Sequence, residues 1–293
     1  MIKLPRAAAL IVNTKSRTGQ DAFRNACRLL AEGGVDLVIA KAVKDPSKLS
    51  DEVRKAVKAK VPMVIVGGGD GSISSAVDHL VGTDTVFGLL PLGTANSFAR
   101  SLCIPLKLEG EISVITGGKC KMIDLGMIDG DYFANCAAIG LSPLIAETVP
   151  HKLKKYLGRP GYLSWAALQL ARFQSFRLTV GEGKSAVTMD ALEVRIANGR
   201  YQGGSEVIET EVGDGDIVIQ VIEGQRRLKL LWSWGLSLGG PGPVRGTVRE
   251  FRGREFRIAT DPPLAISIDG EVLAQTPVTA KLARHAIAVA VPA

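Results

Sequence analysis

The chain has 293 residues, of which 46% are hydrophobic, 22% charged and 5% aromatic. This composition can fill globular cores and excludes a disordered, collagenous or coiled-coil chain, while the length favours two domains. No apolar run reaches the roughly 18–20 residues that cross a bilayer, so no membrane-spanning segment is expected. The four cysteines form no Cys-x-x-Cys pair, which favours a reducing compartment and a cytoplasmic protein.

Residues 1–125 alternate strand patterns with helical patterns. Repeated β–α units of this spacing predict a parallel sheet with helices on both faces, that is, a doubly wound α/β domain. Ligands of such sheets bind at the loops that follow the strands. The predicted strands are 7–12, 37–43, 63–66 and 86–91, and the predicted helices are 20–32, 46–60 and 72–81.

After residue 125 the pattern changes to short alternating strands, separated by turn signals such as Asp129-Gly130, Asn198-Gly199 and Asp269-Gly270. Such dipeptides favour tight turns between antiparallel strands, so a β-rich second domain, a sandwich or barrel, is predicted at 126–283. One helical insertion is expected around 151–173. Because no long linker separates the two domains, they are expected to pack closely, with a site in the cleft between them.

The most distinctive motif is a buried strand that runs into glycines, an aspartate and a helix start, with the sequence VIVGGGDGS at residues 64–72. Glycines let the backbone approach an anion closely, and the helix N-terminus adds N–H donors. The spacing fits neither the dinucleotide fingerprint nor the P-loop. The motif therefore predicts phosphate binding, with a plain strand-to-helix turn as the alternative.

The next predicted strand ends in a loop of the same kind, with the sequence LLPLGTANS at residues 89–97. The two loops follow adjacent strands, so they are expected to converge on one side of the sheet and to form a nucleotide cradle. By itself, Thr94 or Asn96 would more often be a helix cap than a ligand.

Positive charge is concentrated in two segments of a chain whose net charge is +7. Residues 151–177 hold six Lys or Arg without any Asp or Glu, and residues 225–257 hold eight against two Glu; both segments contain aromatic residues. A basic and aromatic segment suits an anionic membrane surface or a nucleic acid. A solvated basic helix is the alternative.

Three motifs, in this order, resemble those of the diacylglycerol kinase catalytic superfamily, in its small bacterial lipid-kinase branch. GGDGS at residues 68–72 matches its GGDG(T/S) motif, PLGTAN at 91–96 its P-x-G-T-x-N motif, and DGE at 269–271 its late D-G-E. The family also includes sphingosine and ceramide kinases. Its nucleotide domain is related to that of the NAD kinases.

The resemblance implies an ATP-dependent kinase that phosphorylates a lipid hydroxyl, with ATP and Mg²⁺ in the first domain and the acceptor in the cleft. It also implies that a strand at about 284–293 returns to the first domain. The residues implied to hold the nucleotide are Asn13, Lys15, Gly68, Gly69, Asp70, Gly71, Ser72, Gly93, Thr94, Ala95 and Asn96. Those implied to organise Mg²⁺ are Asp70, Asp124 and Asp214, and those implied in catalysis are Asp269 as base, Glu271 beside it and Asp70.

One departure from the family and two positions with a second interpretation qualify these assignments. Ser97 stands where many bacterial members of the family carry Asp, so weaker organisation of Mg²⁺ or a different nucleotide preference is expected, rather than an inactive protein. Asp214-Gly215-Asp216 resembles a structural Mg²⁺ loop but also suits a plain turn. Asp269-Gly270 follows an alternating strand pattern, so Asp269 has the second interpretation of a hairpin turn residue.

Three functions therefore stay open. The first is a lipid kinase, which the basic aromatic segments and the D-G-E motif favour. The second is a degenerate nucleotide-binding member without transfer, for which Ser97 is the argument. The third is a kinase of a soluble acceptor, related to the NAD kinases. For the first, the expected partners are a lipid substrate and, reversibly, an anionic membrane surface rather than nucleic acid, with a homodimer left open.

Overall fold

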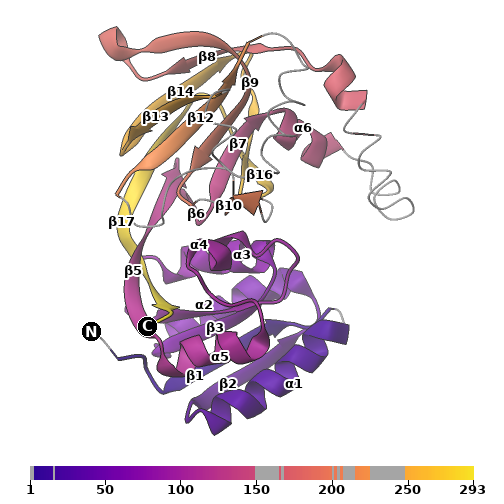
Figure 1. Ribbon diagram of the computed structural model, residues 1–293, viewed down its shortest axis with the longest axis vertical. Coiled ribbons are helices and arrows are strands. Elements are labelled where there is room, and N and C mark those ends of the chain that lie inside the picture. Colours follow the sequence, from indigo (N-terminus) through magenta and orange to yellow (C-terminus); the bar gives the residue numbers. More distant parts are fainter. Residues whose placement is uncertain are drawn as a thin grey trace.

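The computed structural model describes residues 3–15, 17–148, 165, 168–199, 201–202, 205–206, 215–224 and 248–293. Figure 1 shows two domains stacked along the long axis, with a layered α/β domain below and a domain of β-strands above. The predicted fold class, an α/β domain followed by a β-rich domain, is confirmed.

The first domain is built on a parallel sheet in the order β4-β3-β1-β2. Helices cover both of its faces, because apolar side chains of α1 and α5 pack on one face and those of α2 and α3 on the other. The strands are β1 (Ala7–Asn13), β2 (Asp36–Val43), β3 (Met63–Gly68) and β4 (Val86–Pro91). The helices are α1 (Arg17–Glu32), α2 (Leu49–Lys58), α3 (Asp70–Leu80), α4 (Ser97–Ser101) and α5 (Leu108–Gly117).

The helix predicted at 46–60 begins later than expected, at Leu49. A 3-10 turn, Pro46–Lys48, precedes α2, and the Asp45 carboxylate accepts a hydrogen bond from the Ser47 backbone N–H. A side chain that satisfies an early N–H group in this way caps a helix start. The turn places Ser47 and Ser50 at the same edge of the sheet as the glycine loop after β3.

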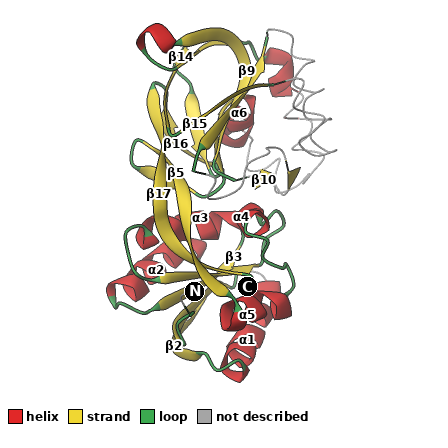
Figure 2. Ribbon diagram, turned by 60° about the vertical axis from the view of Figure 1, so that its left-hand side comes forward, coloured by secondary structure: helices red, strands yellow, loops and turns green. Residues whose placement is uncertain are grey.

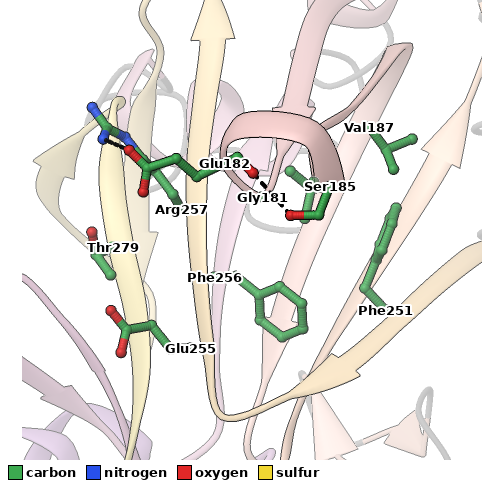
Figure 3. A pocket seen from close by; sticks show the side chains of 10 residues that line it. Gly181, Glu182, Ser185, Val187, Phe251, Glu255, Phe256, Arg257 and Thr279 are labelled. Carbon is green, nitrogen blue, oxygen red and sulfur yellow. Dashed lines mark hydrogen bonds and ion pairs between the residues drawn. The ribbon is translucent and has the colours of Figure 1, made fainter.

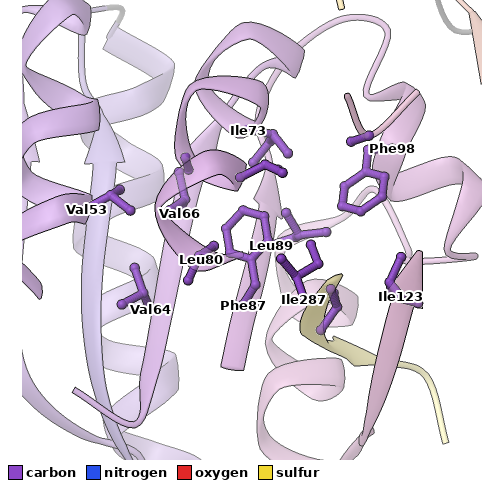
Figure 4. Packing of buried hydrophobic residues seen from close by; sticks show 14 of the residues in the cluster. Val53, Val64, Val66, Ile73, Leu80, Phe87, Leu89, Phe98, Ile123 and Ile287 are labelled. Carbon is purple, nitrogen blue, oxygen red and sulfur yellow. The ribbon is translucent and has the colours of Figure 1, made fainter. Parts of the chain in front are cut away.

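Buried apolar side chains from distant parts of the chain fill the first core. Figure 4 shows Phe87 and Leu89 of β4 among Val64, Val66 and Ile73. On the far side of β4, the fully buried Phe98 lies close to Ile123 and Ile287, which come from the strands that lead to and from the second domain.

The last strand, β17 (Val278–Val291), belongs to both domains. It pairs with β14 in the second domain and in parallel with β4 of the first, where Ala288 faces Val86. Along most of its length it also pairs with β5 (Lys119–Ile128), and Figure 2 shows these two strands running between the domains. The chain thus crosses between the domains through β5 and returns through β17.

The second domain is antiparallel and has its own core. Its polar turns follow the expected dipeptides, since Asp129-Gly130 joins β5 to β6 (Asp131–Phe133) and Asp269-Gly270 joins β15 to β16. The principal strands are β7 (Cys136–Gly140), β8 (Phe176–Val180), β9 (Val187–Ala197), β12 (Ile217–Glu223), β13 (Arg249–Gly253), β14 (Glu255–Asp261), β15 (Ala265–Ile268) and β16 (Glu271–Gln275). Shorter elements are α6 (Leu141–Thr148), the 3-10 turn Gly183–Ser185, β10 (Tyr201–Gln202) and β11 (Ser205–Glu206).

Several expectations fall mostly outside the described residues. These are the helical insertion around 151–173, the greater part of both basic segments, and Asp214 of the turn at 214–216. All four cysteines are described and free, as expected for a chain without disulfides. Within the described ranges, no helix combines the length and apolarity needed to cross a membrane.

Candidate active site

The two glycine loops of the first domain contact each other through their backbones. The Leu92 N–H donates to the Gly68 carbonyl at 2.9 Å, and a Cβ on Gly93 would lie 2.6 Å from the Gly69 Cα. Any side chain at residue 93 would push the loops apart, so glycine is required there. The expected convergence of the loops is therefore present.

Asn96 holds the shape of the second loop. Its Oδ1 accepts from the Gly93 N–H at 2.9 Å, and its Nδ2 donates to the Pro91 and Gly93 carbonyls at 3.2 and 2.9 Å. The residue is buried and has a left-handed backbone with φ 49°. Asn tolerates this conformation and can satisfy backbone groups from its side chain. Asn96 therefore positions the loop, while Thr94 is exposed and Ala95 half-buried beside it.

Asp70 ties the first glycine loop to the second. It is the first residue of α3, and its Oδ1 accepts from the Ser97 backbone N–H at 2.6 Å. A carboxylate at that place satisfies an unpaired N–H group at the start of α4. The contact uses the backbone of residue 97, so it does not depend on whether Ser or Asp stands there.

A third loop, after β1, joins the same edge of the sheet. The Asn13 Nδ2 donates to the Ser72 Oγ at 3.4 Å, and its Oδ1 accepts from the Lys15 N–H at 3.1 Å. The Lys15 side chain is exposed. Three of the predicted nucleotide residues, on two separate segments, are thus in direct contact.

The first glycine loop and the loop after β1 border a cavity of about 490 Å³. The second glycine loop, residues 93–96, supports the first loop and does not line the cavity. Gly71 opens onto it, because a Cβ there would meet no atom within 4 Å. The lining is rich in hydroxyl groups and backbone at the start of α3, where N–H donors favour an anion. The residues that line it are Asn13, Pro46, Ser47, Ser50, Gly69, Gly71, Ser72, Ser75 and Glu271.

Four of those residues were not predicted from the sequence, namely Pro46, Ser47, Ser50 and Ser75. The Ser50 Oγ lies 2.7 Å from His79 Nε2, and the Ser75 Oγ donates to the Ser72 carbonyl. A signal was present, because hydroxyl residues cluster at the starts of α2 and α3. Serines at helix starts are so often caps that the pattern alone does not mark a pocket.

Asp269 is a turn residue and also accepts several hydrogen bonds. Its φ is 45° and that of Gly270 is 98°, which gives the predicted two-residue hairpin. Its carboxylate oxygens also accept the backbone N–H groups of Ala134, Asn135 and Cys136 at 2.8, 3.1 and 3.1 Å. The hydrogen bonds therefore fix the Asp269 side chain in place, which is compatible both with a turn residue and with a general base.

The Asp269 carboxylate also meets the first domain. The Ser74 hydroxyl of α3 donates to its Oδ2 at 3.3 Å. Burial raises the pKa of Asp269 to about 6, while the backbone N–H groups and the Ser74 hydroxyl lower it. Glu271, two residues further on, is exposed and lines the cavity, so the second domain brings two carboxylates to the loops of the first.

Asp124 is engaged elsewhere. It is buried in β5, and its Oδ1 accepts from the His285 backbone N–H at 2.7 Å. That bond holds the place where the pairing of β5 with β17 shifts register, between Ala283 and Ile287. This carboxylate oxygen therefore holds together β5 and β17, the two strands that run between the domains. The expected grouping of Asp124 with Asp70 around a metal gains no support.

A magnesium site made by protein groups alone is not found within the described part of the chain, where no three His, Cys, Asp or Glu residues group together. Mg²⁺ bound with a nucleotide needs fewer protein ligands, because it is usually held by one or two carboxylates together with phosphate oxygens. Asp70, half-buried with one oxygen engaged, fits that smaller demand.

A second pocket, of about 410 Å³, lies in the β-domain, lined by the turn between β8 and β9 and by residues of β13, β14 and β17. Figure 3 shows Phe251 and Phe256 on its walls and the Arg257–Glu182 ion pair, 2.6 Å long, at its rim. None of the predicted site residues lines it. The candidate active site is therefore the cavity at the glycine loops.

Comparisons with known proteins agree with this arrangement. A family described as "Diacylglycerol kinase catalytic domain" matches residues 7–128, and one described as "YegS C-terminal NAD kinase beta sandwich-like domain" matches residues 137–291. The chain is 30% identical to the probable lipid kinase YegS-like of Klebsiella pneumoniae (strain 342), over 91% of this chain and 90% of that one. It is equally similar, with the same coverage, to the probable lipid kinase YegS of Salmonella typhimurium.

The fold is also similar to a solved structure. The crystal structure of a diacylglycerol kinase from Bacillus anthracis str. Sterne superimposes with a TM-score of 0.77 at 18% identity, covering 99% of this chain and 98% of that one. At that identity the likeness concerns the fold. It extends through both domains.

Proposed function

The chain belongs to the diacylglycerol kinase family, in the branch of YegS-like lipid kinases, and from this premise we propose that it transfers the γ-phosphoryl group of ATP to a lipid hydroxyl. The membership confirms the resemblance that the three motifs carry. It supports lipid kinase activity at the level of the family. The use of ATP and the residue roles that follow belong to the proposal.

One observation carries the proposal. The hairpin that bears Asp269 and Glu271 lies against α3, the helix that begins at the glycine loop, and Ser74 joins the two. A carboxylate near the acceptor and N–H donors around the phosphates are the two things that phosphoryl transfer asks of a protein. A plain strand-to-helix turn would not account for a carboxylate hairpin from another domain at this edge.

We assign the nucleotide to the cavity of about 490 Å³. Its phosphates would lie against the backbone of residues 69–72, where Gly71 leaves room that a Cβ would fill. Asn13 and Ser72, which bond to each other, would fix the loop that faces them. Mg²⁺, bound through Asp70, would supply neutralisation of the charge on the phosphates.

Asp269 is the proposed general base. A carboxylate has about four acceptor positions, and three backbone N–H groups and the Ser74 hydroxyl already use them. The Ser74 bond, at 3.3 Å, is the longest of the four. We infer that the acceptor hydroxyl takes its place at Oδ2 and gives its proton there, since a base must lie within hydrogen-bond reach of that proton.

The alternative of a degenerate member without transfer rests on the carboxylate that Ser97 lacks. The Asp70 bond to the backbone of residue 97 does not depend on the side chain there, but it does not replace the missing carboxylate. A transfer assay separates this alternative from a kinase. A kinase of a soluble acceptor would have the same glycine loops. Only the identity of the phosphorylated acceptor distinguishes it from a lipid kinase.

The test is transfer of the label from γ-labelled ATP, with Mg²⁺, to lipids offered in mixed micelles. The panel holds diacylglycerol, monoacylglycerol, phosphatidylglycerol, ceramide and sphingosine, with NAD as the soluble acceptor. The proposal expects label in the organic phase with at least one lipid. Label on NAD alone, or release of inorganic phosphate alone, contradicts it.

A further inference from the structure

A row of polar side chains crosses one face of the second-domain sheet. Arg195 of β9 lies opposite Gln220 of β12, which lies opposite Glu250 of β13. Their sequence neighbours Val194 and Ile219 belong to the hydrophobic core, so the row occupies the other face of the same strands. Figure 1 shows β7, β9, β12 and β13 together in the upper domain.

Two atoms of this row are buried without a partner. Arg195 donates from Nε to Glu193 Oε1 at 2.9 Å, and Gln220 donates from Nε2 to Glu250 Oε1 at 2.7 Å. Among the residues that the structure describes, the Arg195 Nη1 and the Gln220 Oε1 have no hydrogen-bond partner, although the two residues are only 5% and 3% exposed. An unpaired buried donor and an unpaired buried acceptor each destabilise the fold, so both call for a group that completes them.

The row lies close to the candidate active site. β7 separates the two: the Asp269 N–H donates to the Cys136 carbonyl at 3.0 Å, and Arg195 lies opposite Ala138, two residues further along β7. The backbones of Asp269 and Arg195 are thus two strand spacings apart across the sheet, about 10 Å, and two residues apart along it, about 7 Å, so roughly 12 Å separates them.

The buried thiol of Cys136 lies between the row and Asp269, and its pKa responds to charges on both sides. Its pKa is raised to about 12, first by burial and then by the Asp269 carboxylate, and it is also affected by Arg195, Glu193 and Asp70. The charges of Asp269, Asp70 and the Arg195–Glu193 ion pair therefore all act on this one side chain. Cys136 and Ala138 have small side chains and lie on the same face of the sheet as Arg195. No large side chain of β7 therefore stands between Arg195 and Asp269.

Counted over the described residues, the charges of the row cancel. Glu193 balances Arg195, and Arg252, 3.7 Å from Glu250, balances that carboxylate. A net charge of zero gives an anion no electrostatic advantage. The unpaired atoms are one donor and one acceptor, and a hydroxyl is the simple group that accepts from the first while it donates to the second.

We propose that Arg195 and Gln220 bind a second hydroxyl of the acceptor lipid, beside the hydroxyl that is phosphorylated. The substrate class is then an uncharged lipid with two hydroxyls in its head group, of which a monoacylglycerol is the simplest. Diacylglycerol, with one hydroxyl, leaves the pair of atoms unsatisfied. This inference rests on the proposed function and adds a specificity-determining pair to it.

The experiment compares two lipids and two variants in the full chain. Arg195→Lys keeps a cation next to Glu193 but removes the second donor. Gln220→Met keeps the volume but removes the acceptor. Arg257→Lys, at the exposed rim of the second pocket, is the matched control. The readouts are kcat/KM for 1-monoacylglycerol and for 1,2-diacylglycerol, and calorimetric binding of a short-chain 1-monoacylglycerol.

We expect the wild-type protein to prefer the monoacylglycerol. In Arg195→Lys and Gln220→Met, kcat/KM for the monoacylglycerol and its binding should fall about 10–100-fold, as expected for the loss of a hydrogen bond to a substrate hydroxyl, while kcat/KM for diacylglycerol is nearly unchanged. The control should keep both values.

Equal losses with both lipids would assign the row a purely structural role and overturn the inference. An unchanged preference in both variants would mean that a bound water completes the two atoms, which overturns it as well. Binding separates the two proposals: if the wild-type protein binds the short-chain lipid through Arg195 and Gln220 but phosphorylates nothing, the proposed function fails and the assigned site remains. Absence of binding to the wild-type protein contradicts the site.

Discussion

The Ser74 hydroxyl donates a hydrogen bond to Oδ2 of Asp269, 3.3 Å away, although 195 positions separate the two residues in the chain. Ser74 belongs to the helix that begins at the phosphate loop, and Asp269 belongs to a hairpin of the other domain. The contact therefore sets the candidate base at a fixed place relative to the candidate phosphate site. In the proposed transfer the acceptor hydroxyl replaces Ser74 at this oxygen, so the contact marks where the acceptor would bind.

The acid limb of activity should report Asp269. Burial raises its pKa to about 6, and a general base works only when deprotonated, so kcat/KM for lipid phosphorylation should fall as the pH drops below about 6. Ser74→Ala removes a hydroxyl bond that lowers this pKa, so the limb should move to higher pH. Ser113→Ala, on the exposed side of α5, is the control. A limb that stays in place in Ser74→Ala argues against Asp269 as the titrating base.

Asp269→Asn should reduce both turnover and stability. The amide cannot take the proton, so transfer should fall by about 10²–10⁴-fold with ATP affinity retained. Asn suits the turn, but its NH₂ group must face at least one of the N–H groups that the carboxylate now accepts, which should cost about 1–3 kcal/mol in denaturant unfolding.

The chain offers a matched control for that variant. Asp129 also precedes a glycine in a hairpin with φ 50°, and its Oδ1 accepts one bond, from the Thr279 N–H. An Asn can accept the same bond, so Asp129→Asn should leave both stability and turnover nearly unchanged. Near-normal turnover in folded Asp269→Asn would move the role of base to another group, with Glu271 the next candidate.

Gly71→Ala should weaken ATP binding without disturbing the fold. A Cβ at this residue meets no protein atom within 4 Å and faces the cavity, so it would occupy the room assigned to the phosphates. We expect the Kd for ATP to rise about tenfold or more, which is about 1.4 kcal/mol, with the melting temperature unchanged. Gly117→Ala, equally open but on α5, should change neither value. Equal ATP affinity in wild-type and Gly71→Ala protein would remove the nucleotide from this cavity.

Asp70→Asn separates the structural role of that residue from its role toward Mg²⁺. The Asn Oδ1 can still accept from the Ser97 N–H, so the loops should keep their arrangement and stability should change by less than about 1 kcal/mol. The loss of negative charge should raise the Mg²⁺ concentration needed for half-maximal transfer. A Mg²⁺ titration of both proteins measures this, and coincident curves would exclude Asp70 as a ligand.

Membrane contact is expected to come from parts of the basic segments outside the described residues. Within them, Arg249, Arg252 and Arg257 each pair with a glutamate, whereas the three lysines at 152, 154 and 155 belong to a segment of the sequence without any Asp or Glu. Replacing Lys152, Lys154 and Lys155 by Gln should therefore weaken binding to vesicles of phosphatidylcholine with about one third phosphatidylserine by about 100-fold, since each basic residue contributes about 1 kcal/mol. Arg249→Gln is the control. Cosedimentation that ignores both the salt concentration and the lysines would refute the electrostatic attachment.

Local patterns were sufficient to predict the fold class and the glycine loops. Strands β1 to β4 follow apolar runs, and the turns at residues 129–130 and 269–270 follow dipeptides that favour positive φ. The convergence of the two glycine loops followed from the rule that loops after adjacent parallel strands lie at one edge. Each of these inferences needed only neighbouring residues.

The contacts that define the site depend on the pairing of distant strands. Asp269 meets the N–H groups of residues 134–136 because β15 lies beside β7, and Asp124 meets His285 because the pairing of β5 with β17 shifts register there. Neither pairing is encoded in a local motif. For the same reason, the sequence alone did not show that Arg195 lies opposite Gln220, because this depends on the pairing of β9 with β12.

The most direct test of the account is a single-turnover experiment with γ-labelled ATP, Mg²⁺ and an excess of enzyme, in the presence of the best acceptor of the lipid panel. For the wild-type protein, the account predicts label that moves from ATP into the extracted lipid. For Asp269→Asn, it predicts ATP bound with the same affinity but almost no labelled lipid over the same time. Label in the lipid at equal rates in both proteins, or label released only as phosphate by the wild-type protein, would contradict it.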